Sequence, residues 1–377
     1  MPQVNLFEDQ RPKASGADAT PIHATFWLPT FPRTRFQGSK RKVLPELSVA
    51  FSKLEFNSAL DLYSGSGMVT LLLRYLGKKV HANDYQRFAC TTAEVFLALQ
   101  GSECAKRAKI LEDLEDLLHR ASIRKPELVT ERYENIFFTD TENREIDRFA
   151  QNINQYSEPY RSLLIYAVGQ ALLKKRPYNL FHRANLHMRT TDVPRSFGNA
   201  ATWETSIIEH SIQAIEDLAK FPFSSLRCDG VVSCVNTSGL DSLPGDFDLV
   251  YLDPPYLNRR GVVVDYSDFY GFLDGLCQYE LFAEGDVSYP HRPIQKKPSN
   301  WNDADSALLE LRRIAEKWPR SVLFLSYRSD GQLAVEDVHA ALSANGRRVE
   351  VHTCGEYKYA LSTTDTNEEL FLISRPS

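Results

Sequence analysis

The sequence predicts an α/β protein with a doubly wound mixed sheet, interrupted by a helical insertion. Short apolar runs that are typical of buried strands alternate with segments of helical periodicity, first within residues 58–100 and again near the C-terminus. Between them, charged amphipathic helical patterns occur without a convincing strand. We therefore divide the chain into an N-terminal arm (1–33), an α/β domain made of two segments (34–100 and 226–377), and a helical insertion (101–225).

Composition indicates a cytoplasmic protein with an ample core. At 377 residues the chain is longer than one average domain, and its 43% hydrophobic content is ample for a packed core. The net charge of −5 argues against a generally basic nucleic-acid-coating protein. The six cysteines show neither CxxC spacing nor companion histidines, so we expect no metal site and reduced thiols. No apolar run approaches the ~20 residues of a membrane span, and the N-terminus lacks a signal-peptide core.

The first helix of the α/β domain begins beside a cationic cluster. In Phe36-Gln37-Gly38-Ser39-Lys40, glycine separates an aromatic ring from basic side chains, and apolar residues at helical spacing follow from Val43. A helix N-terminus beside flexible backbone is able to bind an anion such as a carboxylate. A solvated basic helix start is the alternative.

A strand, a glycine turn and a helix follow. Ser58–Tyr63 reads as a strand that contains Asp61, Gly65 and Gly67 as a tight turn, and the next apolar residues as a helix. Thr70 stands where a dinucleotide fingerprint has its third glycine, which disfavours a nicotinamide cofactor. A second strand ends at Asp84, 17 positions after Gly67, a spacing that suits a ribose acceptor. Alternatively, Asp84 caps the helix that follows.

The insertion carries one basic stretch, residues 174–195. Cations there are interleaved with aromatic and amide side chains, so the stretch offers both phosphate neutralisation and base-edge hydrogen bonds. A solvated basic loop is the alternative. The candidate nucleic-acid contacts are Arg176, Asn179, Arg183, Asn185, Arg189 and Arg195.

Further strands are expected in the second half of the α/β domain. They lie at residues 231–235, 247–252, 321–328, 349–352 and 370–373, with a helix at 300–318 and long loops after 256 that could form a lid.

The stretch Asp253-Pro254-Pro255-Tyr256 directly follows the apolar strand that ends at Leu252. The prolines end the hydrogen-bond ladder, so Asp253 projects from the carboxyl end of the sheet, where ligands of open α/β sheets bind. A carboxylate, carbonyls without competing N–H groups and a flat ring suit the exocyclic amino group of a flipped-out nucleobase. A strand that ends in a proline-rich turn is the alternative.

Taken in this order, the motifs resemble those of the Dam-like adenine-N6 DNA methyltransferases in their alpha arrangement. The resemblance implies a Rossmann-like methyltransferase fold, S-adenosyl-L-methionine as cofactor, double-stranded DNA as substrate, and a prokaryotic or phage-encoded enzyme with a possible cognate restriction endonuclease. It implies catalytic roles for Asp253, Pro254, Pro255 and Tyr256, with Ser326-Tyr327-Arg328 beside the base pocket. The implied cofactor residues are Phe36, Gly38, Lys40, Asp61, Tyr63, Gly65, Gly67, Asp84 and Asn236.

The resemblance has one departure and leaves alternatives. Family members usually carry an acid after the strand that precedes the catalytic one, where this chain has Asn236 and Thr237. Asn236 is able to hydrogen-bond an adenine amino group. The insertion matches the family in position and not in sequence, so target specificity is not carried over. An RNA or protein-glutamine methyltransferase, a cytosine-N4 enzyme and a catalytically silent DNA-binding factor are the competing interpretations.

Overall fold

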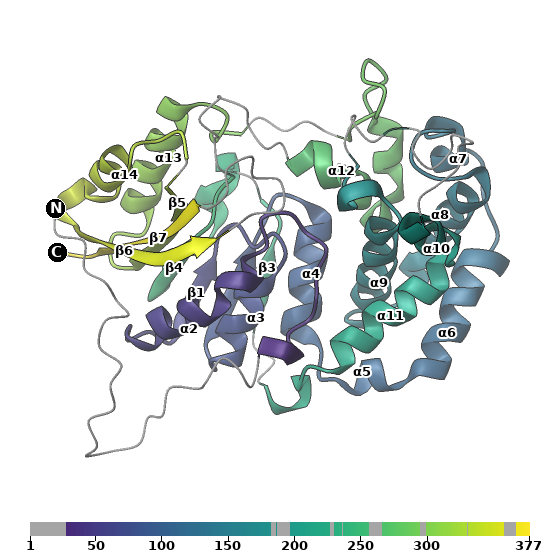
Figure 1. The fold of residues 1–377 in the computed structure, drawn as a ribbon, viewed down its shortest axis with the longest axis horizontal. Coiled ribbons are helices and arrows are strands. Elements are labelled where there is room, and N and C mark those ends of the chain that lie inside the picture. Colours follow the sequence, from purple (N-terminus) through teal and green to yellow (C-terminus); the bar gives the residue numbers. More distant parts are fainter. Residues whose placement is uncertain are drawn as a thin grey trace.

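One mixed sheet organises the molecule (Figure 1). The computed structural model describes residues 28–181, 186, 197–226, 230–235, 237–255, 266–294, 299–329, 331–357 and 367–377. Seven strands in this part of the chain form a sheet with the order β3-β2-β1-β4-β5-β7-β6. Their bounds are β1 Ser58–Asp61, β2 Lys79–Asn83, β3 Val231–Ser233, β4 Leu249–Leu252, β5 Val322–Arg328, β6 Arg348–Tyr357 and β7 Asn367–Arg375. The predicted doubly wound α/β sheet is confirmed.

The parallel strands create a switch point beside β1. β1 pairs in parallel with β2 on one side and β4 on the other, with Leu60 opposite both His81 and Val250. β3 extends the sheet beyond β2, and β5 extends it beyond β4. Because the strand order reverses between β1 and β4, the carboxyl ends of these two strands flank a crevice where ligands of such sheets bind.

The C-terminal strands complete the sheet with the opposite direction. β7 pairs antiparallel with β5, and Arg328 lies opposite Glu369 in this register. β6 pairs antiparallel with β7 and has an irregularity between Thr353 and Gly355. The last two strands thereby make the sheet mixed.

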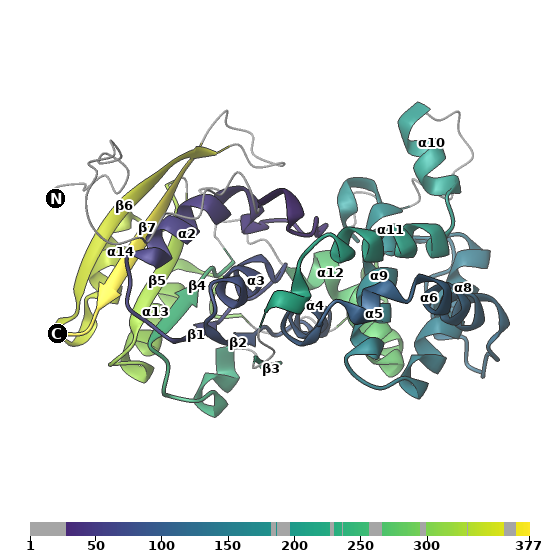
Figure 2. The same cartoon turned by 90° about the horizontal axis from the view of Figure 1, so that it is seen from below.

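Helices cover both faces of the sheet (Figures 1 and 2). Leu249 and Tyr251 of β4 belong to one buried core and Val250 and Leu252 to the other, as expected for a strand covered on both sides. The first core includes side chains of α2 (Leu44–Ser52), α3 (Met68–Tyr75) and α4 (Arg87–Ala98). The second includes side chains of α13 (Ala304–Lys317) and α14 (Val335–Leu342).

A second, helical part lies beside the sheet (Figure 2). In its centre, every residue of α9 (Tyr160–Lys174) from Ser162 to Leu173 is buried, and α9 packs against α4 and α11 (Ile207–Ala219). The described residues of 101–225 contain no strand. The helices are α5 Ser102–Ala105, α6 Arg107–Glu115, α7 Leu128–Arg132, α8 Asp140–Asn152, α9 Tyr160–Lys174, α10 Phe197–Glu204 and α11 Ile207–Ala219.

This helical part also contains a segment that follows β4. Residues expected to lie in long loops instead form α12 (Tyr266–Cys277) and a 3₁₀ segment, Tyr279–Glu284. The Tyr279 hydroxyl donates to Asp147 of α8 (2.6 Å), and Leu128 N–H donates to the same hydroxyl (2.7 Å). The helical part is therefore built from two chain segments and not from 101–225 alone.

The last residues of the N-terminal arm pack against the rest of the protein. Phe31 is 2% exposed, and its ring packs edge-on against Phe221 (4.8 Å between ring centres) and Tyr75 (5.9 Å). The arm predicted at 1–33 thus joins the packed structure from Leu28 onward, and residues 1–27 lie outside the described part. Among the described helices, none has both the length and the apolar character needed to cross a membrane.

Candidate functional site

A cavity with about 580 Å³ of empty volume opens at the carboxyl ends of β1, β2 and β4. Its walls come from the segment before α2, the turn after β1, the end of β2, the end of β4 and the start of α12. The lining residues are Phe36, Gln37, Gly38, Lys40, Asp61, Tyr63, Ser64, Gly65, Ser66, Val69, Asp84, Tyr85, Gln86, Tyr251, Asp253, Pro255 and Tyr266. The structure therefore brings together most of the residues that the sequence selected from three distant segments.

The turn between β1 and α3 needs both of its glycines. Gly65 and Gly67 have φ angles of +45° and +70°, a region that other residues rarely adopt. A Cβ at Gly67 would lie 2.6 Å from the Phe96 ring of α4, so the turn also packs tightly against that helix. Gly67 is predicted to bind cofactor but does not line the cavity; its position fixes the path of the turn that does.

Asp61, at the end of β1, presents a buried carboxylate to the cavity. The Thr70 hydroxyl donates a 2.6 Å hydrogen bond to Oδ2, whereas Oδ1 is buried and has no hydrogen-bond partner among the described residues. Burial raises the pKa of Asp61 to about 7; the Thr70 hydrogen bond opposes this rise, and the nearby Asp253 and Asp84 add to it. The unsatisfied oxygen makes Asp61 a ready acceptor for a cationic donor.

Asp84, one residue beyond β2, closes the turn after β1. Oδ2 accepts a hydrogen bond from the Gly65 N–H (2.9 Å) and Oδ1 accepts one from the Gln86 N–H (3.0 Å). Asp84 lines the cavity while it orders two backbone segments of its wall. Its carboxylate has further lone pairs, so these bonds are compatible with accepting from a ligand hydroxyl.

An aromatic wall joins the first motif to α12. The Phe36 ring stacks on Tyr270 (4.2 Å between centres) and on Tyr266 (5.7 Å). Gln37 N–H donates to the Tyr270 hydroxyl (2.6 Å). Gly38 has φ +78°, and a Cβ there would lie 2.7 Å from the Tyr266 hydroxyl oxygen. The glycine is thus required by close approach as well as by backbone conformation.

Lys40 and Asp253 form an ion pair inside the cavity wall. The Lys40 Nζ lies 2.7 Å from Oδ1 of Asp253 and 3.7 Å from Oε1 of Glu369. The lysine is 3% exposed, Glu369 is fully buried and Asp253 is 16% exposed. Burial lowers the pKa of Lys40, but the two carboxylates outweigh this effect and leave the pKa above its ordinary value. Lys40, predicted to hold cofactor, is therefore a charged partner of the acid that follows β4.

The two prolines after Asp253 line two neighbouring cavities. Pro255 lines the main cavity, and both prolines line a smaller apolar cavity that also contains Trp301, Leu325 and Tyr327. Tyr327 belongs to the segment predicted to lie beside the base pocket. Tyr256 and Asn236 lie outside the described residues, so their predicted roles stay predictions.

Arg176, which is predicted to contact DNA, is buried in the structure. Arg176 is 2% exposed; its guanidinium donates to the carbonyls of Phe137 (3.0 Å) and Leu180 (3.3 Å) and lies 4.8 Å from the centre of the Phe137 ring. Arg176 lies just after α9, and both of its carbonyl acceptors lie outside that helix, so it ties the end of α9 to other segments.

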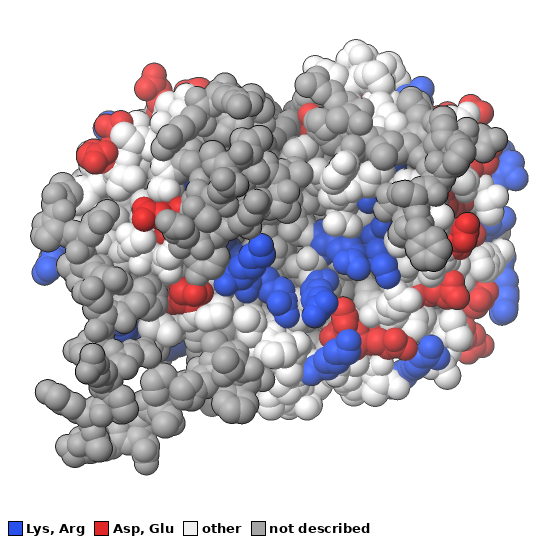
Figure 3. Space-filling model, in the orientation of Figure 1, with Lys and Arg blue, Asp and Glu red and all other residues white. Residues whose placement is uncertain are grey.

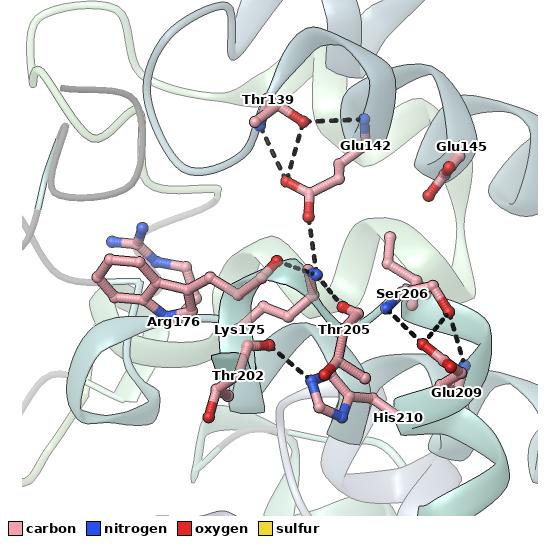
Figure 4. Close-up of polar contacts among 12 residues, drawn as sticks. Thr139, Glu142, Glu145, Lys175, Arg176, Thr202, Thr205, Ser206, Glu209 and His210 are labelled. Atoms are coloured by element: carbon pink, nitrogen blue, oxygen red, sulfur yellow. Dashed lines mark hydrogen bonds and ion pairs between the residues drawn. The ribbon is translucent and has the colours of Figure 1, made fainter. Parts of the chain in front are cut away.

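Lys175 is engaged in the same way (Figure 4). It is 2% exposed, its Nζ pairs with Glu142 (3.1 Å), and it donates to the carbonyls of Trp203 (2.7 Å) and Thr205. Asn179 is half-buried in a turn with φ +56°. The remaining predicted contacts, Arg183, Asn185, Arg189 and Arg195, lie outside the described residues.

A group of cations lies elsewhere on the surface. Figure 3 shows Lys and Arg side chains gathered in the middle of the displayed face, where the sheet meets the helical part. Burial lowers the pKa of Arg35, Asp217 opposes this, and Arg33 lowers it further; burial also lowers the pKa of Lys174, with a smaller contribution from Arg35 that Asp217 opposes. The Arg35 N–H donates to the Gln170 side chain of α9 (2.8 Å), one helical turn before Lys174, so the segment of Arg33 and Arg35 lies beside the end of α9; sequence reasoning selected neither arginine.

Several cavity residues were also missed. Tyr85, Gln86, Tyr251 and Tyr266 line the site although none was selected. For Tyr266, the signal was the spacing of Tyr266, Phe269, Tyr270 and Leu273, which is typical of one helix face. The others are neighbours of selected residues, and only the fold shows which of them turn inward.

Comparison with known proteins identifies relatives along most of the chain. Residues 36–300 match the family described as D12 class N6 adenine-specific DNA methyltransferase, a range that includes every residue of the cavity wall. The chain is also similar to the Type II methyltransferase M2.HphI of Haemophilus parahaemolyticus. The two are 24% identical over 330 residues, which cover 86% of this chain and 91% of that protein.

Proposed function

Because the chain belongs to the D12 class N6 adenine-specific DNA methyltransferases, we propose that its cavity binds S-adenosyl-L-methionine and that Asp253 holds the target adenine. The protein is a site-specific DNA methyltransferase that methylates adenine. The single observation that carries the proposal is the placement of Asp61, Asp84 and Asp253 around one cavity. Three carboxylates are available there for a cationic amine, a ribose and an exocyclic amino group.

The residues of the cavity fit the proposed cofactor. The buried and unpartnered Oδ1 of Asp61 is an acceptor for the amino group of the methionine part. Asp84, which follows β2, is positioned for the ribose hydroxyls, and the stacked rings of Phe36 and Tyr266 supply an apolar wall. Gly38 and Gly65 line the cavity without side chains, so their backbone lies close to the ligand space.

The target amino group is a poor nucleophile because its lone pair is delocalised into the adenine ring. Asp253 accepts a hydrogen bond from one N–H of the amino group, and the Pro254 carbonyl accepts one from the other. These two hydrogen bonds allow the nitrogen to pyramidalise and its lone pair to point at the methyl carbon. S-adenosyl-L-methionine supplies that methyl group from a sulfonium, which retains the electron pair of the broken bond. The new N–C bond replaces one N–H bond, whose proton leaves to solvent.

A carboxylate that is already paired still serves this purpose. Asp253 has about four lone-pair sites, so it is able to hold Lys40 and accept from an amino group at the same time. The ion pair fixes the carboxylate in one orientation, which lowers the entropy cost of placing the base. Tyr256 is proposed to stack on the extruded base and offset part of the cost of unstacking.

The competing activities lack support of this kind. The match to an adenine-specific DNA family disfavours RNA, glutamine and cytosine-N4 substrates. A catalytically silent DNA-binding protein would not require the buried Asp61 oxygen Oδ1 without a hydrogen-bond partner among the described residues, nor the Asp253 carboxylate at the same cavity. Similarity to a Type II methyltransferase from a bacterium supports a role in the cytoplasm with a cognate restriction endonuclease as partner.

The DNA duplex is proposed to contact Arg33, Arg35 and Lys174, and the basic residues from Arg183 to Arg195 stay proposed DNA contacts. Arg33 is exposed and Arg35 and Lys174 are half-buried, so their charges are accessible to phosphates, which supports this proposal. DNA from cells that express the protein, sequenced with a readout of modified adenine, tests the function. We expect N6-methyladenine within one short sequence; its absence, or modified cytosine in its place, would contradict the proposal.

A further inference from the structure

Glu369 is a buried acid in the middle of the antiparallel strand β7. It is fully buried, whereas the preceding residue, Glu368, is exposed. Successive side chains of a strand point to opposite faces, so Glu369 lies on the same face as Phe371, which belongs to the core beneath α2. A carboxylate at such a position is costly unless charged partners stabilise it.

Lys40 is a charged partner of Glu369, and a second cation lies opposite Glu369 in the sheet. The Lys40 Nζ lies 3.7 Å from Oε1 of Glu369, and Arg328 stands opposite Glu369 in the β5–β7 register. The same Nζ lies 2.7 Å from Asp253. Lys40 therefore bridges an acid of the core and the acid of the proposed reaction, and the burial of Lys40 and Glu369 limits the screening of their charges by solvent.

We propose that Glu369 is a positioning residue for methyl transfer, which anchors the Lys40 ammonium against Asp253 and offsets its positive charge. This inference rests on the proposed role of Asp253. At 3.7 Å the attraction of Glu369 for the Lys40 ammonium is electrostatic and not a hydrogen bond, and it acts from a different carboxylate than the close contact with Asp253. Glu369, Lys40 and Asp253 form a row of alternating charges, and this row holds the Asp253 carboxylate in one orientation.

The charge of Glu369 matters as well as its position. Methyl transfer places positive charge on the adenine amino nitrogen before a proton leaves, and Asp253 stabilises that charge. Lys40 works against this stabilisation, because its ammonium lies 2.7 Å from the same carboxylate and offsets the negative charge of Asp253. Glu369, on the far side of Lys40, restores negative charge to the group without occupying space in the cavity.

Glu369→Gln tests the proposal, with Glu368→Gln as the matched control one residue away on the exposed face. We expect the single-turnover rate of methyl transfer by Glu369→Gln to fall roughly 10- to 100-fold at saturating cofactor. Cofactor affinity should stay within about threefold, because Glu369 does not line the cavity. The control should match the wild type in both, and Glu369→Asp, which keeps the charge, should recover part of the rate.

A double variant separates positioning from a general structural role. If Glu369 acts through Lys40, then Lys40→Met/Glu369→Gln is no slower than Lys40→Met alone, whereas independent effects would multiply. This comparison also serves if Glu369→Gln alone fails to fold, because the double variant removes the lysine charge together with that of Glu369. Multiplying penalties, or a wild-type rate for Glu369→Gln, would overturn the inference.

The proposed function fails in a different experiment. An inactive Asp253→Ala beside a fully active Glu369→Gln would remove only the role of Glu369. An active Asp253→Ala would remove the proposed site, whatever the Glu369 variants do.

Discussion

The hydroxyl of Thr70 donates a 2.6 Å hydrogen bond to one oxygen of the Asp61 carboxylate, across the turn that joins β1 to α3. Thr70 occupies the position at which a dinucleotide fingerprint has its third glycine. Thr70 therefore orients the Asp61 carboxylate, whose other oxygen is buried and has no hydrogen-bond partner among the described residues.

Thr70→Val is expected to weaken cofactor binding although the residue does not line the cavity. The hydrogen bond from Thr70 lowers the pKa of Asp61, so its loss raises that pKa and reduces the ionised fraction at neutral pH. We expect affinity to fall roughly 3- to 10-fold at pH 7 and the deficit to shrink toward pH 8. Calorimetric titration measures this, with Thr92→Val as a buried threonine control whose hydroxyl bonds a helix carbonyl. Equal affinities of Thr70→Val and wild type would contradict the account.

The pKa of Asp61 also predicts how cofactor affinity depends on pH. The carboxyl must be ionised to accept from an ammonium, and its pKa is raised to about 7 in the folded protein. Affinity should therefore rise by about an order of magnitude between pH 5.5 and pH 7, below the range in which the cofactor amine titrates. Asp61→Asn should bind cofactor weakly at every pH. A flat wild-type profile would show that Asp61 is already ionised throughout.

Asp61→Asn should weaken cofactor binding but increase the free energy of unfolding. The folded pKa of about 7 exceeds the ordinary value of 3.8, so the wild type is destabilised increasingly as pH rises from about 4 to about 7 and uniformly above that. Without cofactor, the variant should have a higher free energy of unfolding, by on the order of 1–4 kcal/mol at pH 8 and less at pH 5. Urea denaturation measures both; a variant less stable than wild type at pH 8 would contradict the burial argument.

Arg176→Ala is expected to destabilise the protein and not to weaken DNA binding specifically. The substitution removes two hydrogen bonds to buried carbonyls and the contact with the Phe137 ring. We expect a loss of roughly 2–4 kcal/mol in the free energy of unfolding. At temperatures where the variant is folded, the salt dependence of its DNA affinity should equal that of the wild type. A changed salt dependence with unchanged stability would restore Arg176 as a phosphate contact.

Arg33 and Arg35 are expected to contact phosphate. Alanine at either position should weaken duplex binding and reduce the slope of log affinity against log salt by about one unit. Cofactor affinity should not change. The exposed pair Arg320 and Asp246 offers a control at a surface arginine that already has an acidic partner. If Arg35→Ala retains the wild-type slope, the duplex lies elsewhere.

The sheet could be predicted from sequence because its signals are local. Buried parallel strands such as β1 and β4 are short apolar runs, and the glycine turn after β1 is visible in the spacing of Gly65 and Gly67. The rule that ligands bind at the carboxyl ends of such strands selected Asp253, the spacing after Gly67 selected Asp84, and the resemblance to a known family implied Asp61; in the structure all three line one cavity.

Features that depend on distant contacts escaped prediction. Nothing in the run of cations from Lys174 to Arg176 shows that two of them are buried, because their carbonyl partners lie in other segments. The partnership of Lys40 with Asp253 and Glu369 joins residues more than 200 positions apart. The helix α12 was missed because the prolines and glycines around it suggested loops, although its aromatic spacing was helical.

Methyl transfer by Asp253→Ala tests the central claim most directly. Asp253 lies at the cavity and is paired with Lys40, and in the proposed reaction its carboxylate accepts from the target amino group. A radiolabelled transfer assay on duplex DNA, run beside cofactor and DNA binding by the same variant, should show binding largely retained and a rate lower by on the order of 10²–10³ or more. Turnover near the wild-type rate by a variant that binds both ligands would contradict the claim.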